Sequence, residues 1–143
     1  MEGDVRDLAK ARLLRAEEML SSAKRNYAEN DLKTALNRSY YAILHAMRSV
    51  NALEQYDSSK HSGVIAYFIQ HTLKTGRMDS GFSVVIKKAS YCRNKSDYDD
   101  FYIVSREETA EQIKNAEKFV GAVKTYLEIE IRDADNNMKD ESD

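Results

Sequence analysis

The sequence predicts an all-α protein, an antiparallel up-and-down bundle of four to five helices. The 143 residues contain no proline and only five glycines, whereas strands need frequent turn residues and helix interiors exclude both. Hydrophobic residues make up 42% of the chain and charged residues 32%, a balance typical of helices with one buried face and one solvated face. Apolar residues also recur at spacings of three and four through most of the chain.

The length favours one domain, because single domains most often have about 100–150 residues. We expect this domain to cover residues 1–132 and to be followed by an acidic, disordered tail of residues 133–143. The tail holds five acidic residues and one lysine with almost no apolar content, a composition that cannot bury enough surface to fold. The net charge is −2 for the whole chain and −4 for the tail, so residues 1–132 carry a net charge of +2. This small positive charge neither requires nor excludes a nucleic-acid ligand.

The first predicted helix covers about residues 4–29 and has a single apolar stripe between charged faces. That stripe consists of Ala9, Leu13, Ala16, Leu20, Ala23 and Tyr27. Asn30 and Asp31 interrupt the pattern, and Asp31 can cap a second helix that ends near Ala52. So short a break predicts an antiparallel helical hairpin.

Two shorter helices are expected in the middle of the chain. The polar loop EQYDSSKHSG offers Ser58 or Ser59 as the N-cap of the third helix. This helix should end at Gly76, which suits a left-handed residue after the last turn. Asp79 should then cap the fourth helix. The last helix should begin at the segment SREE, where Ser105 has the spacing of a capping box.

Polar side chains on the second helix leave two interpretations open. Arg38, Tyr41 and His45 share one face beside the main apolar stripe. They could line a pocket in which an arginine binds phosphate, a tyrosine stacks and a histidine exchanges protons. Alternatively, the tyrosine packs against a neighbouring helix while the arginine and the histidine stay at the rim.

Arg93 extends the apolar stripe of the fourth helix, where a charge is costly unless it is paired. Asp97, four residues further on, could supply a helical ion pair. The alternative is a guanidinium held at a seam between helices or subunits to bind a phosphate. His61 and His71 are isolated in the sequence, and we assign them no role.

The cysteine and histidine content indicates neither a metal site nor a cofactor. No set of these residues has metal-ligand spacing, and no Gly-rich phosphate loop occurs. Cys92 is the only cysteine, so it cannot form an internal disulfide and a reducing compartment is favoured. No apolar run approaches the roughly 18 residues that span a membrane. We therefore expect a soluble, cytoplasmic protein that does not contact a membrane.

Three segments of the chain resemble the HEPN domain family. They are ALNRSYYAILHAMRSV at residues 35–50, KHSGVIAYFIQHTLKTGRMD at residues 60–79 and YCRNKSDYDDFYIVSREETAEQIKNAEKFV at residues 91–120. The resemblance extends over roughly residues 4–127 and is strongest to small stand-alone bacterial and archaeal members. It implies a helical bundle that forms homodimers and pairs with a minimal nucleotidyltransferase in toxin–antitoxin modules.

The resemblance also implies a functional motif. Catalytic members of the family are metal-independent RNases that use an arginine, a polar residue after it and a histidine four to six residues beyond. Arg93 matches the arginine and Asn94 the polar residue, but Asp97 and Tyr98 occupy the region of the histidine. No histidine follows His71, so the catalytic form of the motif is incomplete.

The expected function is that of a dimeric binding module that engages a nucleotidyltransferase partner, a nucleotide or RNA. The candidate ligand-binding residues are Arg93, Tyr98, Arg38, Tyr41 and His45. One alternative is a metal-independent RNase in which Arg93, Asn94 and Asp97 are catalytic. The other is an interaction scaffold that binds no small ligand.

Overall fold

The protein is an all-α bundle, as the sequence predicts. The computed structural model describes the backbone of residues 2–142 and the side chains of residues 5–137. Within this range the elements are α1 (Glu2–Ala28), α2 (Leu32–Ala52), α3 (His61–Phe68), the π-helical turn η1 (Ile69–Leu73), α4 (Phe82–Tyr98) and α5 (Arg106–Ser142). No strand occurs in the described part of the chain, and no helix there is long and apolar enough to cross a bilayer.

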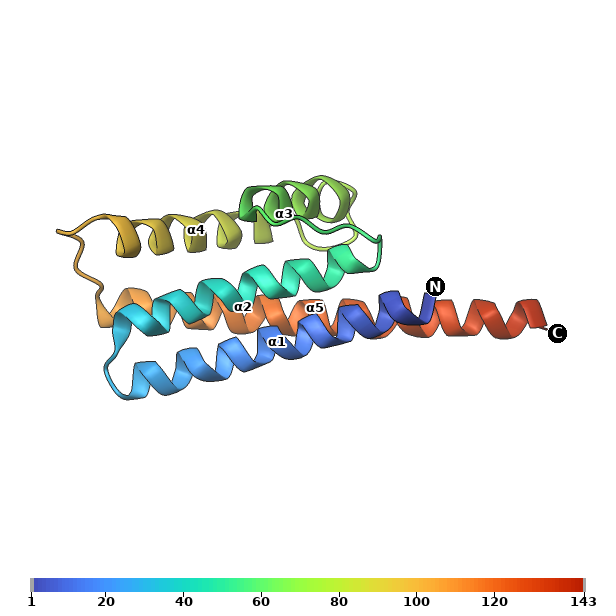
Figure 1. Ribbon diagram of the computed structural model, residues 1–143, viewed down its shortest axis with the longest axis horizontal. Helices are drawn as coiled ribbons and strands as arrows, with labels where there is room; N and C mark the ends of the chain where they lie inside the picture. The colour runs from blue at the N-terminus through green and yellow to red at the C-terminus, as the bar shows by residue number, and fades with distance from the viewer. Residues whose placement is uncertain (1, 143) are drawn as a thin grey trace.

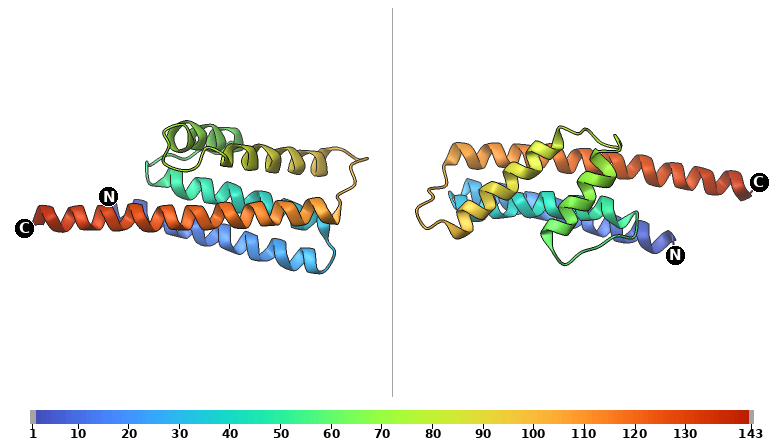
Figure 2. Two further views of the ribbon diagram at one scale, coloured as in Figure 1. Left: turned by 180° about the vertical axis from the view of Figure 1, so that it is seen from behind. Right: turned by 90° about the horizontal axis from the view of Figure 1, so that it is seen from above.

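The helices form two layers. α1, α2 and α5 run side by side along the long axis of the molecule (Figure 1). α3 and α4 cover the opposite side of α2 and cross the long helices obliquely (Figure 2). Phe119 of α5 connects the layers, because its ring packs edge-on at 5.5 Å from Phe68 and at 5.2 Å from Phe82. α2 therefore packs against α1 and α5 within its own layer and against α3 and α4 of the other layer.

Several predicted helix ends are confirmed by hydrogen bonds. The Asp31 carboxylate accepts a hydrogen bond of 3.3 Å from the Thr34 amide and caps α2. Ser105 accepts a bond of 3.0 Å from the Glu108 amide at the start of α5. Gly76 has a φ of 79°, the left-handed conformation that glycine adopts without steric cost.

The predicted caps of α3 and α4 are wrong by one or two residues. α3 begins at His61, and Lys60 before it makes no side-chain cap. The Ser58 hydroxyl instead accepts a 3.1 Å bond from the Lys60 amide inside the loop. Gly81 occupies the N-cap of α4, while Asp79 accepts a 2.8 Å bond from the Gly81 amide. In both loops the short polar side chain stabilises a turn before the helix rather than the helix itself.

The third helix also departs from regular geometry. The sequence predicts one continuous helix, whereas the structure has a π-helical turn over Ile69–Leu73 after α3. The Lys74 amide donates to the Ile69 carbonyl at 2.8 Å, a bond that spans five residues. The wider turn buries Thr72 and Leu73 together.

α5 continues through the segment that the sequence assigns to a disordered tail. Its backbone is helical to Ser142 and projects beyond the bundle at the end where the chain begins (Figure 1). Asp135 forms an ion pair with Arg6 of α1. Extending an existing helix needs no new nucleus, so a polar segment can continue it without an apolar face. Whether residues 133–143 contribute to the stability of the bundle stays a prediction.

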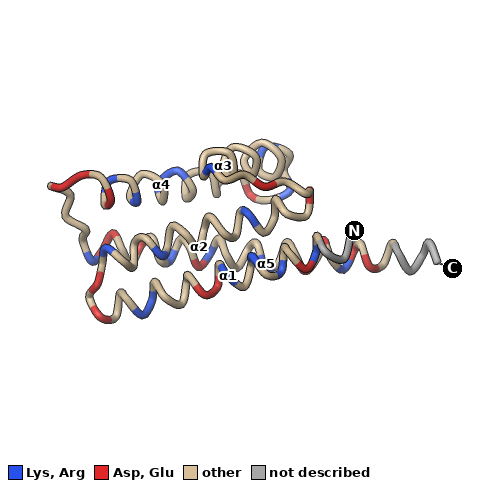
Figure 3. Tube along the Cα trace, in the orientation of Figure 1, with Lys and Arg blue, Asp and Glu red and all other residues tan. Residues whose placement is uncertain are grey.

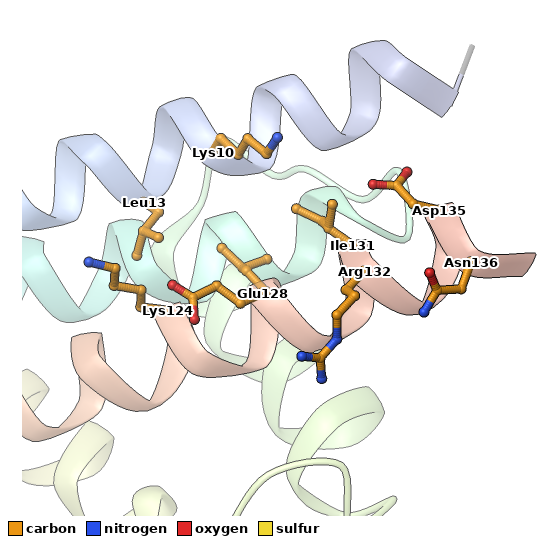
Figure 4. Close-up of a pocket in the computed structure, with 9 residues that line it drawn as sticks. Lys10, Leu13, Lys124, Glu128, Ile131, Arg132, Asp135 and Asn136 are labelled. Carbon is orange, nitrogen blue, oxygen red and sulfur yellow. The ribbon is translucent and has the colours of Figure 1, made fainter. Parts of the chain in front are cut away.

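An open groove separates α1 from residues 124–136 of α5 (Figure 4). Its volume is about 530 Å³. Leu13 and Ile131 contribute apolar surface from the two helices, and charged side chains such as Lys10 and Glu128 surround it (Figure 4). None of the residues predicted to be functional lines this groove.

Candidate functional site

The site is built on the face of α4 that packs against α2. Ile86 and Ala89 are buried there, and Arg93 follows them with its side chain only 20% exposed. The predicted stripe is therefore confirmed, including the charge at its end. A half-buried guanidinium has lost part of its hydration and needs polar or aromatic neighbours.

Three such side chains, those of Asp97, Tyr41 and Tyr40, lie next to Arg93. Its Nε lies 3.1 Å from Oδ2 of Asp97, which confirms the predicted helical ion pair, although this nitrogen makes no hydrogen bond. Its Nη2 donates to the Tyr41 hydroxyl at 3.4 Å. The guanidinium carbon lies 5.3 Å from the ring centre of Tyr40 and 5.8 Å from that of Tyr41, within cation–π range. Nη1 makes no hydrogen bond with the described residues, so one edge of the guanidinium can still donate.

His61, to which the sequence analysis assigns no role, lies in this cluster. Its Nδ1 lies 3.0 Å from the Tyr40 hydroxyl, and its ring packs edge-on against Tyr41 at 5.6 Å. His61 and Arg93 thus contact the same two tyrosines from different helices. The spacing of residues within one helix cannot predict that side chains from two helices contact the same tyrosines. The only signal for His61 in the sequence is that it lies within a segment that resembles the HEPN domain family.

An ion-pair network holds the loop that leads to His61. The Asp57 carboxylate lies 3.1 Å from Nη2 of Arg12 and 3.3 Å from Nη2 of Arg48. The same Arg48 nitrogen donates to the Ser58 carbonyl at 3.3 Å. α1 and α2 therefore fix the position at which α3 begins.

The electrostatics favour a neutral His61. Burial lowers its pKa from the usual value of 6.5, and the positive charges of Arg93 and then Arg48 lower it further. Burial raises the pKa of the Tyr40 phenol, against the opposing effect of Arg93. These pKa shifts favour a neutral imidazole at His61 and a neutral phenol at Tyr40.

His45 is held neutral more strongly. Burial, followed by the charges of Arg15, Arg48 and Arg12, lowers its pKa to about 4. Its ring lies 6.1 Å from that of Tyr41, at the edge of the cluster. Because imidazole keeps one donor and one acceptor when neutral, both histidines retain the capacity for proton transfer.

Arg38 does not join its predicted neighbours. Tyr41 reaches Arg93 and His45 contacts Tyr41, but Arg38 donates to Asn37 Oδ1 at 2.6 Å. No contact connects Arg38 with the cluster in the part of the chain that the structure describes. The predicted polar face is thus divided, with Tyr41 and His45 at the cluster and Arg38 outside it.

The four motif residues on α4 also separate into two faces. Arg93 points toward Tyr40 and Tyr41 of α2, with Asp97 paired beside it. Asn94 and Tyr98 lie on the outer side, and Tyr98 is 76% exposed. A shallow pocket of about 310 Å³ on that outer side is lined by Tyr91, Asn94, Lys95, Tyr98 and Asp99. Residues one apart on a helix diverge by about 100°, so adjacent motif positions cannot serve one face.

Cys92 and the acidic side chains form a separate environment. Cys92 is buried, as expected, and its Sγ lies 3.1 Å from Oε1 of Glu108. Burial and then this hydrogen bond raise the pKa of the thiol to about 12. Acidic residues also occur in the connection between α4 and α5 (Figure 3). Among the described residues, no group of three or more histidine, cysteine or carboxylate side chains could hold a metal ion.

The fold and the site together define a class of helical domains with a polar arginine site between two packed layers. Comparison with known proteins identifies the family. The HEPN domain model matches residues 9–126, which is most of the chain, and the protein therefore belongs to the HEPN domain family.

Relatives of similar size support this assignment. A UPF0332 protein of Thermotoga maritima is 30% identical over 114 residues, which cover 80% of this chain and 86% of the relative. A Methanocaldococcus jannaschii protein named as a predicted toxin is 32% identical over 124 residues, which cover 87% and 92%. A second protein of that organism with the same kind of name is 26% identical over 113 residues, which cover 79% and 77%.

Proposed function

We propose that the protein is a dimeric binding module whose Arg93 site recognises a phosphate of a nucleotide or of RNA. The observation that supports this function is the half-buried guanidinium with an unused donor edge at Nη1. Arginine binds phosphate through such paired donors, and the tyrosines beside it restrict its rotamers. Tyr98 and Asn94, on the outer face of α4, would contact a ligand that extends around the helix.

The proposed partner is a minimal nucleotidyltransferase, in a pair of the toxin–antitoxin kind. The names of the two Methanocaldococcus jannaschii relatives support a toxin-like role. Family membership supports the nucleotidyltransferase, since small stand-alone members of the family form such pairs. Co-purification of the chain with the product of a neighbouring nucleotidyltransferase gene tests this part of the proposal.

A binding experiment tests the site itself. Hexauridylate without a terminal phosphate is titrated into the purified protein, and the Kd is measured for wild type and Arg93→Ala. Loss of a charged hydrogen-bond donor should weaken binding by about tenfold or more. Arg25→Ala is the matched control, because Arg25 is exposed on α1. Equal affinity of Arg93→Ala and wild type would contradict the proposal and favour a scaffold without a ligand.

A metal-independent RNase is the second candidate, and the two neutral histidines near Arg93 favour it. An imidazole can accept the proton of a ribose 2′-hydroxyl as its oxygen attacks phosphorus and the 5′-oxygen leaves with a proton from solvent. The guanidinium then stabilises the negative charge that develops on the phosphoryl oxygens. Because the catalytic form of the motif is incomplete, we expect RNA to remain intact in the presence of a chelator. Cleavage that disappears in both Arg93→Ala and His45→Ala would establish the enzyme instead.

A further inference from the structure

His61 and Arg93 lie on one patch although they come from α3 and α4. Both contact the Tyr40 and Tyr41 side chains: the guanidinium carbon lies 5.3 and 5.8 Å from the two ring centres. His61 reaches the Tyr40 hydroxyl at 3.0 Å and the Tyr41 ring at 5.6 Å. The two side chains therefore flank the same pair of aromatic rings.

Each of the two side chains has spare hydrogen-bonding capacity. The bond to Tyr40 uses Nδ1 of His61, and Nε2 makes no hydrogen bond within the described residues. Nη1 of Arg93 is similarly without a hydrogen bond there. His61 is only partly buried, so its ring edge is accessible to a ligand in solution.

We propose that His61 and Arg93 form the two arms of one phosphate site, and that His61 takes up a proton when a phosphate binds. This inference rests on the proposed function of the Arg93 site and adds a second binding residue to it. The proton comes from solvent and binds Nδ1, which then donates to the Tyr40 oxygen. Nε2–H donates to a phosphate oxygen, and Nη1–H of Arg93 donates to another.

The physical cause is a change in the charges around the imidazole. In the free protein Arg93 and Arg48 oppose a positive charge on His61 and help to lower its pKa. The other groups that contact it are the phenols of Tyr40 and Tyr41, and His45 lies nearby and is neutral. A bound phosphodiester offsets the arginine charges, so the imidazolium form is favoured and its pKa rises.

The consequence is a pH-dependent affinity. Binding should tighten as the pH falls between the pKa of His61 in the complex and its pKa in the free protein. One linked proton changes the Kd by up to about tenfold per pH unit in that interval. Hexauridylate without a terminal phosphate is a suitable probe, because its uracils and phosphodiesters keep a constant charge over about pH 5 to 8, where histidine titrates.

The first measurement compares the pH dependence of the Kd in three proteins. Wild type and the control His71→Gln should bind hexauridylate more tightly at lower pH. His61→Gln should bind more weakly at low pH and lose most of this dependence, and its melting temperature reports whether the lost Tyr40 bond disturbs the fold. An unchanged pH dependence in a folded His61→Gln would overturn the inference.

The second measurement needs no variant. The chain has only three histidines, so their imidazole proton resonances can be followed by NMR against pH. With hexauridylate bound, the titration midpoint of His61 should rise, while His71 should not respond to the probe. A midpoint of His61 that stays the same or falls would overturn the inference even if His61→Gln does not fold.

The outcomes separate the two proposals. Binding that depends on Arg93 but shows no proton uptake at His61 would refute this inference and leave the proposed function intact. Binding that is indifferent to Arg93→Ala, or no binding at all, would refute both.

Discussion

At Arg93, the cost of burying a charge is offset by contacts with three side chains, one on α4 itself and two on α2. The ion pair with Asp97 is partly screened, since their side chains are 20% and 26% exposed. The Tyr41 hydroxyl and the two tyrosine rings add polar and cation–π contacts. These contacts are sufficient for a structural role, which is why a binding measurement rather than a stability measurement decides the function of Arg93.

His45 should make the stability of the protein depend on pH. Its pKa is about 4 in the folded protein and ordinarily 6.5. As the pH falls below 6.5 the unfolded chain binds a proton first, so the free energy of unfolding decreases until the pH approaches 4. After discounting for solvent screening at this half-buried ring, the loss is about 1–2 kcal/mol.

Thermal melts across this pH range measure the effect. The melting temperature of wild type should fall more steeply than that of His45→Gln, whose side chain does not titrate. His71→Gln, at an exposed position, serves as the control and should follow the wild type. Parallel curves for wild type and His45→Gln would show that the native ring is not held neutral.

At the scale of single elements, α4 presents the candidate site residues on two faces rather than one. Its inner face places Arg93 against α2 with Asp97 paired beside it, while its outer face exposes Asn94 and Tyr98. In the sequence these four residues form one motif, because they are close together in the chain. Helical geometry separates them, so a single ligand can contact all four only by extending around α4.

The C-terminal part of α5 should contribute little to stability. Removing residues 133–143 eliminates the ion pair of Asp135 with Arg6, whose side chains are 55% and 17% exposed. Such a pair contributes about 0–1 kcal/mol, which corresponds to a change in melting temperature of at most about 2–8 °C. Circular dichroism melts of the truncated and full chains measure the difference.

Asp135→Asn in the full chain separates the ion pair from the rest of the segment. It should reproduce most of the small effect of the truncation. A truncation that costs much more than this substitution would mean that residues beyond Arg132 pack against α1 across the groove of Figure 4.

At the scale of the whole molecule, we propose that α4 pairs with a second copy of the chain through its outer face, so that a ligand reaching Asn94 and Tyr98 would lie at the seam between the two copies. Val84, Tyr91 and Tyr98 recur every seven residues and are 68%, 59% and 76% exposed. Phe101 and Ile103, in the connection that follows, are 93% and 86% exposed. A row of exposed apolar side chains at heptad spacing suits pairing with a second helix.

Light scattering at high micromolar concentration should therefore detect a dimer, and Tyr91→Glu should convert it to a monomer by placing a charge at the centre of the row. Leu14→Glu is the matched control, since Leu14 is 58% exposed on α1 and outside the proposed interface. A wild type that is strictly monomeric, or a dimer that tolerates Tyr91→Glu, would contradict this interface.

The sequence by itself determined the elements of this protein. Apolar spacing, the absence of proline and the caps at Asp31 and Ser105 define most helices, because these signals act between residues close in the chain. The ion pair of Arg93 with Asp97 was predictable for the same reason, since it spans one helical turn. The family followed from motifs in order along the chain.

Only the tertiary structure decided which polar residues form a site. It brings His61 to the tyrosines that hold Arg93, excludes Arg38 and turns Asn94 and Tyr98 outward. These outcomes depend on how α3 and α4 cross α2, which is determined by the packing of side chains such as Phe68 and Phe119. The spacing of residues along a single helix does not predict how the helices cross, because the contacting residues are distant in sequence and come together only when the core is packed.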